Sequence, residues 1–225
     1  LSTLPLTNAS KTMKLPEQAK RHLTMSTPNL KRLSDFIQAA TKLMDDHDDT
    51  QRPPAGIQSL LADLVAHDDW LPESCAVPHP TFYQQFLLHC DPLERFSLVS
   101  FVWGPGQQTP VHDHMVWGFI GMLRGAELSQ RYRSNPDGTL TADGAPDRLE
   151  PGMVDVLLPA EGDIHQVFNA YDDQPSISIH LYGGNIGAVS RHVFDLASGL
   201  PKTFISGYSS DRMPNVWDRS ANRKT

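Results

Sequence analysis

The chain is poor in cysteine, in positive charge and in long apolar runs, and each shortage excludes a class of protein. Two cysteines among 225 residues, Cys75 and Cys90, are too few for a disulfide scaffold, so we expect a reducing, cytoplasmic setting. With 26 acidic against 19 basic residues the net charge is -7, which argues against a nucleic-acid partner. No apolar run approaches the roughly 20 residues that span a bilayer, so no membrane partner is expected.

Helical periodicity is confined to the first third of the chain. The segment "SDFIQAATKLMDD" has apolar residues at helical spacing with Ser34 as a candidate N-cap, and "GIQSLLADLVAHDD" repeats the pattern after the chain-breaking "RPPAG". We therefore predict a helical unit over residues 29–78 that packs on the rest of the protein. Residues 1–28 lack a hydrophobic period and are predicted to be a flexible leader, and residues 209–225 a C-terminal tail.

From Thr81 onward the pattern changes to short β-branched and aromatic segments separated by turns such as "GPG", "NPDG" and "AEGD". Eight or more such strands are typical of a β-sandwich or small barrel. We therefore predict an all-β fold, a small barrel or jelly roll over residues 79–208, with an N-terminal helical layer. The expected strands are "TFYQQFLLH", "RFSLVSFVWG", "HMVWGFIGMLRG", "AELSQRYR", "GMVDVLLP", "IHQVFNA", "SISIHLYGG" and "SRHVFDL".

The tripeptide His112-Asp113-His114 is the first candidate for chemistry. On a strand, residues i and i+2 point to the same face, so His112 and His114 would stand side by side and could chelate a divalent metal with a third ligand from elsewhere. The alternative is a solvated strand face. Taken alone, the tripeptide favours the solvated face over the metal site.

The spacing of other residues around these histidines favours the metal-site interpretation. This spacing resembles the two signature motifs of the cupin superfamily. In cupins the first motif usually supplies two histidines and a glutamate, and the second supplies a further histidine. This sequence has Gly118 where the glutamate would stand, and the second motif carries extra residues around Pro159. The resemblance spans roughly residues 80–195 and implies the ligands His112, His114 and His165. The residues that carry it are Gly106, His112, His114, Gly118 and Gly125, then Pro159, Gly162, His165 and Asn169.

Loss of the glutamate has a chemical consequence. Three neutral imidazoles leave a bound Fe(II) with its full double charge, which favours an anionic ligand such as a thiolate in the open positions. Three ligands on one side with open positions also suit oxygen activation.

The segment "SISIHLYGG" narrows the activity. Ser178, His180 and Tyr182 share one strand face, which is either a polar face in water or a hydrogen-bonded chain that holds the Tyr182 hydroxyl near the metal. Together with three histidine ligands, this series resembles the cysteine dioxygenase family. The resemblance implies an Fe(II) enzyme that adds both atoms of O2 to a thiol, giving a sulfinate.

Three positions point to a branch of that family. Animal enzymes specific for cysteine have an arginine where this chain has Gln85, and a cysteine that cross-links to the tyrosine where this chain has Gly118. Arg191 is instead expected on an otherwise apolar strand face, where a guanidinium needs an anion; the alternative is a surface arginine at the edge of the strand. This pattern is similar to the bacterial 3-mercaptopropionate dioxygenases. It implies that Arg191 binds the substrate carboxylate, Tyr182 hydrogen-bonds nearby and Gln85 shapes the pocket.

Several alternatives stay open at the level of sequence. The preferred thiol could be cysteine or mercaptosuccinate, and the latter would require a second cation such as Arg124 or Arg131. The chain could also be a cupin enzyme acting on a non-thiol acid, or a cupin that only binds a ligand. Trp117, Phe119 and Val167 are candidates for an apolar lining that excludes water.

Overall fold

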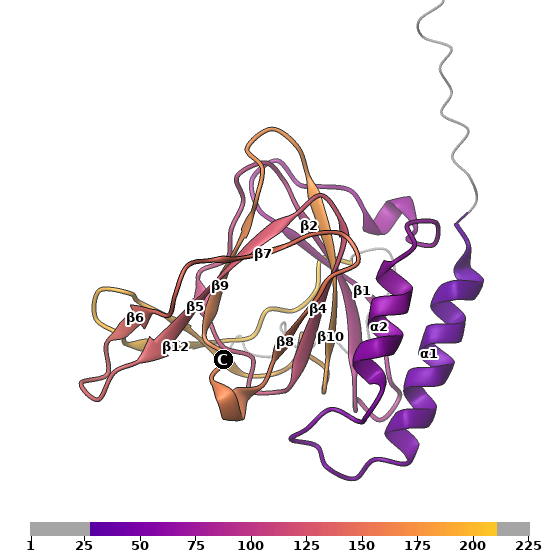
Figure 1. The fold of residues 1–225 in the computed structure, drawn as a ribbon, viewed down its shortest axis with the longest axis horizontal. Coiled ribbons are helices and arrows are strands. Elements are labelled where there is room, and N and C mark those ends of the chain that lie inside the picture. Colours follow the sequence, from indigo (N-terminus) through magenta and orange to yellow (C-terminus); the bar gives the residue numbers. More distant parts are fainter. Residues whose placement is uncertain (1–27, 211–225) are drawn as a thin grey trace, which may run out of the picture.

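The computed structural model describes residues 28–210. Most of the predicted leader (1–28) and most of the predicted tail (209–225) lie outside these residues. Two helices come first, and strands joined by turns and loops follow (Figure 1). The helices are α1 (Leu30–Asp45) and α2 (Ile57–Val65), with short 3-10 turns η2 (Glu73–Cys75) and η3 (Pro159–Glu161).

Within residues 28–210, twelve strands form two antiparallel sheets that face each other as a barrel. The five-stranded sheet has the order β1-β2-β10-β4-β8, and the seven-stranded sheet runs β12-β11-β3-β9-β5-β6 with β7 also paired to β5. The strands are β1 (Gln84–Cys90), β2 (Ser97–Trp103), β3 (Val111–His112), β4 (Gly118–Arg124), β5 (Glu127–Ser134), β6 (Leu140–Ala142), β7 (Asp147–Leu149), β8 (Val154–Leu157), β9 (His165–Asn169), β10 (Ser176–Tyr182), β11 (Arg191–Phe194) and β12 (Pro201–Phe204).

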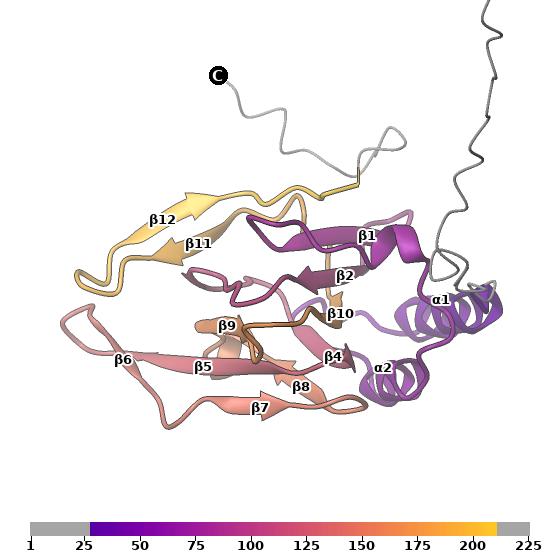
Figure 2. The ribbon, with the colours of Figure 1, turned by 90° about the horizontal axis from the view of Figure 1, so that it is seen from above.

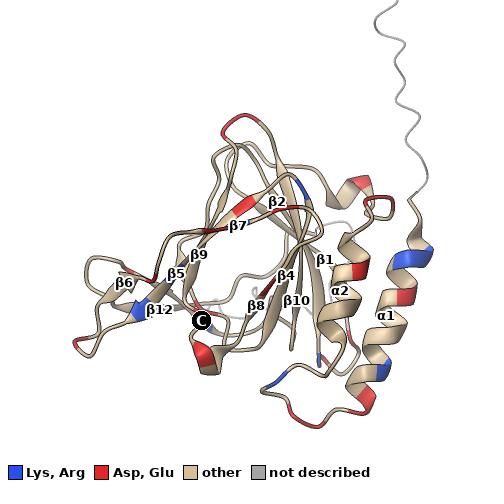
Figure 3. Cartoon of the chain, in the orientation of Figure 1, with Lys and Arg blue, Asp and Glu red and all other residues tan. Residues whose placement is uncertain are grey.

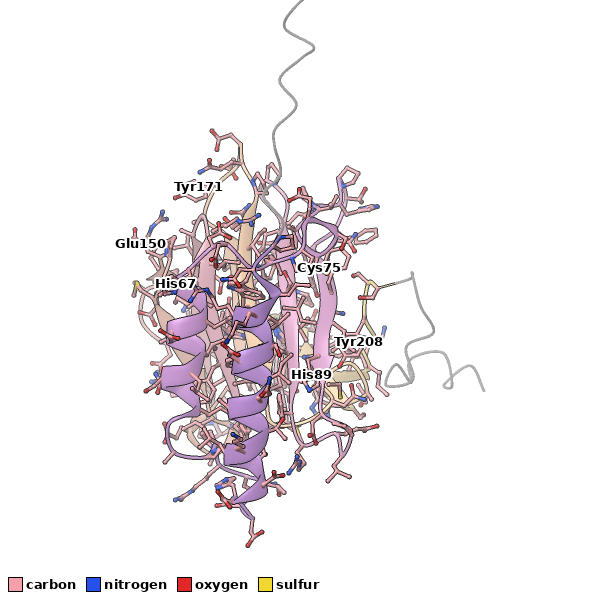
Figure 4. The ribbon with its side chains drawn as sticks, turned by 90° about the vertical axis from the view of Figure 1, so that its right-hand side faces the viewer. His67, Cys75, His89, Glu150, Tyr171 and Tyr208 are labelled. Carbon is pink, nitrogen blue, oxygen red and sulfur yellow. The ribbon has the colours of Figure 1, made fainter. Side chains whose placement is uncertain are left out.

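The helices cover the outer face of the five-stranded sheet. Seen from above, α1 and α2 lie on one side of the barrel and β6 and β12 project on the opposite side (Figure 2). Viewed from the helical side, the two helices stand in front of the strands (Figure 4). The contact is close because β4 has a glycine there: a Cβ on Gly121 would lie 2.8 Å from a methyl group of Val65 on α2.

Strand alternation gives the five-stranded sheet two buried faces. On β2, Leu98 and Val102 pack toward the helices, whereas Val99 and Phe101 point into the barrel. Strand β10 is buried along its whole length for the same reason. Its polar residues therefore face the barrel interior, and the solvent-facing alternative for them is wrong.

The predicted all-β barrel with an N-terminal helical layer is confirmed. All eight expected strands are present, but the structure adds β3, β6, β7 and β12, which are only two to four residues long. Ser34 is not an N-cap, since α1 begins at Leu30 and Ser34 accepts a hydrogen bond from Gln38 within the helix.

Basic and acidic residues alternate along α1 (Figure 3). Among the described residues, no helix combines the length and apolar character needed to cross a bilayer.

Candidate active site

Three histidines that are far apart in the sequence meet inside the barrel. His112, His114 and His165 have ring centroids 4.8 to 4.9 Å apart, and one candidate ligand atom from each lies within 4.8 Å of the others. All three side chains are buried. The structure thus brings together the three metal ligands that the sequence resemblance implied.

Backbone pairing places these rings, although not as one continuous strand. His112 on β3 is directly opposite His165 on β9. The strand ends at His112, so His114 reaches the cluster from the following loop, where Met115 has a left-handed φ of 62°. Only His112 lies within a strand, but the two rings stand side by side as predicted. Asp113 turns aside and accepts hydrogen bonds from the backbone and ring nitrogens of His192.

Each ring is held by a hydrogen bond at Nδ1. The partners are the Pro110 carbonyl for His112 (3.0 Å), the Asp163 carboxylate for His114 (3.2 Å) and the Ser129 hydroxyl for His165 (3.1 Å). A carbonyl accepts only, so Nδ1 of His112 must carry the proton and Nε2 keeps its lone pair. Such outer hydrogen bonds orient histidine ligands in metal sites.

The donor set fits a divalent transition metal. The Nε2 atom of His114 is buried and has no hydrogen-bond partner among residues 28–210, which is costly unless a metal ion takes that lone pair. Asp163 also accepts the backbone N–H of His114 at 2.9 Å, so its carboxylate fixes both the loop and the ring.

Burial keeps the histidines neutral, the form that binds a metal. It lowers the pKa of His112 to about 4, and the nearby Arg191 charge acts in the same direction. Burial also holds the pKa values of His114 and His165 well below the ordinary range of histidine. Protons therefore compete weakly for these ligands at neutral pH.

Facing the histidines from β10 is an unbroken hydrogen-bonded chain. The Ser178 hydroxyl lies 2.8 Å from Nε2 of His180, and Nδ1 of His180 lies 2.8 Å from the Tyr182 hydroxyl. The Trp103 indole N–H donates to Ser178 at 3.1 Å. The Tyr182 ring stacks on His114 with centroids 5.6 Å apart. The hydrogen-bonded series therefore ends beside the three candidate metal ligands.

Gly118 is the cross-strand partner of Tyr182. A Cβ placed on Gly118 would lie 3.0 Å from Cδ1 and 3.1 Å from Cε1 of the Tyr182 ring. A side chain at this position would therefore touch the ring directly. With glycine, the described residues offer no sulfur here for a thioether to Tyr182.

Arg191 is buried at the start of β11, with 4% of its surface exposed. Its guanidinium carbon lies 4.8 Å from the centroid of the Phe204 ring, and its Nε atom has no hydrogen-bond partner among the described residues. The positive charge affects the pKa values of His112, His180 and Tyr182, so it faces the barrel interior. The alternative of an exposed arginine at the edge of the strand is wrong.

Gln85 lies on β1 opposite Phe101, on the strand face that points into the barrel. Its side-chain amide donates to the Ser206 carbonyl at 3.5 Å, and its backbone pairs with Ser209. The segment after β12 therefore covers this end of β1. Its residue Tyr208 is labelled on the right in Figure 4.

The apolar lining differs from the one expected. Trp117 and Phe119 pack in the core between the sheet and the helices, whereas Val167 does point into the barrel. The main interior aromatic is Phe101, whose ring stacks on His180 at 4.0 Å. Tyr83 completes this group by packing against Phe101. The mostly apolar segment "SLVSFVW" indicated a buried strand, but it did not show which of the strand's two faces points into the barrel.

Both arginines considered as a second cation for the substrate, Arg124 and Arg131, already form ion pairs with aspartates. Arg124 makes two hydrogen bonds to Asp68 on the helical side of the protein. Arg131 donates to Asp155 at 2.6 Å and to the Val156 carbonyl. Arg191 thus differs from both, because it is buried without an acidic partner within hydrogen-bonding distance among the described residues.

Sequence reasoning missed the residues that support the ligands. Asp163 stands two residues before His165 in "GDIH", and only this proximity could have drawn attention to it. Ser129 and Glu127 lie on β5, a strand that carried no motif, and their importance follows only from where the sheets meet.

Comparison with known proteins agrees with the geometry. The family described as cysteine dioxygenase type I matches residues 87–194, a segment that contains the three histidines, the Ser178–His180–Tyr182 chain and Arg191. The match supports membership of that family. Gln85 lies just outside the matched segment.

Solved structures of low sequence identity match about half of the chain. A conserved Klebsiella pneumoniae protein with a double-stranded β-helix domain is 14% identical, with 52% of this chain and 91% of that chain covered and a TM-score of 0.41. A Cupin 2 conserved barrel domain protein from Salinispora arenicola is 19% identical, with 52% and 87% covered and a TM-score of 0.36. The barrel of the present chain and its N-terminal helical part are established by its own sheet order and helices.

Proposed function

We propose that this protein is an Fe(II)-dependent thiol dioxygenase of the cysteine dioxygenase family, acting in the cytoplasm on 3-mercaptopropionate. The thiol and one O2 give the sulfinate, both oxygen atoms passing to sulfur. The observation that carries the proposal is the cluster of three buried histidines with the Tyr182 ring stacked on one of them, and the Arg191 cation, which has no acidic hydrogen-bond partner within residues 28–210, facing the same interior.

His112, His114 and His165 would hold the iron through Nε2. Bound there, ferrous iron would supply open coordination positions for the thiolate and O2 and the electrons that O2 activation requires. The absence of a carboxylate among the ligands leaves the site with a net positive charge, which favours a thiolate over a neutral ligand.

The residues of the chain would bind and orient the substrate. Arg191 would bind the carboxylate through its guanidinium fork, which matches the geometry of a carboxylate. The Tyr182 hydroxyl, held at 2.8 Å by His180, would donate a hydrogen bond to a polar atom near the sulfur. Phe101 would keep water away from His180, since their rings stack at 4.0 Å.

The charge inventory favours an acid with a single carboxylate. Mercaptosuccinate carries a second carboxylate and would need a second cation, but Arg124 and Arg131 are already paired with Asp68 and Asp155. Cysteine would add an ammonium group next to the buried Arg191 charge, which is unfavourable. Both observations support 3-mercaptopropionate.

The test is O2 consumption by the Fe(II)-loaded protein with 3-mercaptopropionate, cysteine and mercaptosuccinate under identical conditions, with quantitation of the sulfinate. We expect the highest kcat/KM for 3-mercaptopropionate and one sulfinate per O2. The matched control is His114→Ala, which should abolish both metal retention and turnover. Lack of thiol-dependent uptake with all three acids would contradict thiol dioxygenase activity and leave a non-thiol cupin enzyme or a ligand-binding cupin.

A further inference from the structure

Glu127, at the start of β5, is a carboxylic acid that the mechanism above does not use. Its side chain is completely buried. Neither of its carboxyl oxygens has a hydrogen-bond partner within residues 28–210. A buried carboxyl left in this state is costly, and such groups concentrate at functional sites.

The surroundings of Glu127 place it at the inner end of the Ser178–His180–Tyr182 chain. Strand β10 brings the Ser178 hydroxyl toward the carboxyl and β2 brings the Trp103 indole. Both polar groups lower the pKa of Glu127, although neither meets the distance and angle of a formed hydrogen bond to it. These two groups are hydrogen-bonded to each other at 3.1 Å. The carboxyl therefore lies beside Ser178, which is at the opposite end of the hydrogen-bonded series from Tyr182.

The other elements around Glu127 contribute few charges. Strand β8 brings Asp155, whose negative charge raises the pKa of Glu127 and whose partner is Arg131 on β5 itself. On β9 the residue opposite Glu127 is Asn169, whose side-chain N–H groups donate to backbone carbonyls. Burial is the largest effect and raises the pKa of Glu127, as does the Asp155 charge, whereas Ser178 and Trp103 lower it; the resulting pKa is about 7.

The hydrogen-bonding capacity of Ser178 limits how the chain can be arranged. A serine hydroxyl has one proton to donate and two lone pairs, and the Trp103 N–H occupies one lone pair. The single proton can go to Nε2 of His180 or to Glu127, but not to both. Burial holds the pKa of His180 well below its usual range, so this ring has one N–H and two possible tautomers.

We propose that Glu127 is a positioning residue that sets the direction of the hydrogen-bonded chain and thereby decides whether Tyr182 can donate toward the substrate. When Glu127 is protonated, it donates to Ser178, Ser178 donates to Nε2 of His180, and Nδ1–H of His180 donates to the Tyr182 oxygen. The Tyr182 O–H then points to the site.

When Glu127 is ionised, the direction reverses. Ser178 donates to the carboxylate, His180 donates from Nε2 to Ser178, and Tyr182 donates to Nδ1 of His180. The tyrosine then has no proton left for the substrate. The consequence for turnover rests on the proposed thiol dioxygenase function, whereas the reversal itself does not.

The test follows the tautomer of His180 in the metal-free protein. Nitrogen-15 NMR of histidine-labelled protein distinguishes Nδ1–H from Nε2–H, and the His180 signals are assigned by their loss in His180→Gln. We expect wild type to change from the Nδ1–H to the Nε2–H form as the pH rises through about 7. Glu127→Gln keeps a similar shape but cannot ionise, so the change should be lost between pH 5.5 and 8.5.

The control is Glu150→Gln, at an exposed glutamate on the surface (Figure 4), which should behave as wild type. A His180 tautomer that is independent of pH in wild type, or one that still changes in Glu127→Gln, would overturn the proposal.

A second measurement decides the matter if Glu127→Gln does not fold. The infrared band of a protonated carboxyl should disappear in wild type at the same pH midpoint as the change in tautomer, and distinct midpoints would refute the coupling. Neither measurement uses iron or thiol, so a failed oxygen assay and a failed tautomer test are distinguishable.

Discussion

Replacing Arg191 by methionine should separate substrate binding from structure. Methionine roughly fills the volume of the arginine stem but carries no charge. Truncating one partner of a buried hydrogen-bonded charge pair costs about 2–5 kcal/mol. At about 1.4 kcal/mol per factor of ten, kcat/KM for 3-mercaptopropionate should fall between about 30-fold and several thousand-fold.

The same change should leave the substrate-free protein at least as stable. Arg191 is buried without an acidic partner within hydrogen-bonding distance among the described residues, so methionine removes a desolvated charge, at the cost of a cation–π contact with Phe204 of about 0.5–2 kcal/mol. We expect the Tm and the iron content to change little. An arginine with a purely structural role would instead lower the Tm together with the activity.

The assay compares 3-mercaptopropionate with ethanethiol, which has the thiol but no carboxylate. The loss in Arg191→Met should be large for the acid and near zero for ethanethiol. The control Arg124→Met removes an arginine paired to Asp68 outside the barrel and should affect neither substrate. Equal losses for both thiols, or unchanged kcat/KM for the acid, would refute the carboxylate-binding role.

Four further changes test other parts of the site. Tyr182→Phe keeps the ring on His114 but removes the hydroxyl. The value of kcat/KM should fall about 10- to 100-fold, as expected for a lost hydrogen bond to a charged group, while iron binding is retained. Unchanged turnover in O2-uptake assays would exclude the role of the hydroxyl. Asp163→Asn loosens the His114 ligand and should weaken metal affinity about 10- to 100-fold in a chelator competition titration, and an unchanged affinity would contradict this support. Gly118→Ala brings a Cβ to 3.0 Å from the Tyr182 ring and should destabilise the protein by about 1–3 kcal/mol in urea unfolding; a neutral result would mean that the ring moves freely. The pKa of His112 is about 4 in the folded protein and near 6.5 in the unfolded chain, so the unfolded state binds protons first as the pH falls. The metal-free protein should therefore lose stability between about pH 6.5 and 4. A flat free energy of unfolding over this range would argue against buried neutral histidines.

The sequence was sufficient for those features that have a local period or a fixed spacing. Alternation along the strands predicted the barrel, and helical spacing predicted the covering layer, because periodicity reflects which face of an element is buried. The histidine ligands and the polar series on β10 were also predictable, since motif spacing survives in the linear chain. The strands that were missed, such as β3, are too short to have a period.

Tertiary structure alone decided which side chains face each other across the barrel. The sequence could not show that Ser178 and Glu127 meet, because they lie on β10 and β5, in different sheets. Nor could it show that Phe101 rather than Trp117 contacts the site. Both are buried aromatic residues, and only the structure shows which face of the sheet each one lies on. The sequence by itself predicted the two helices, the longer strands and the three histidines that come together. Packing of the two sheets decided which buried groups are left without partners, since that depends on contacts between residues far apart in the chain.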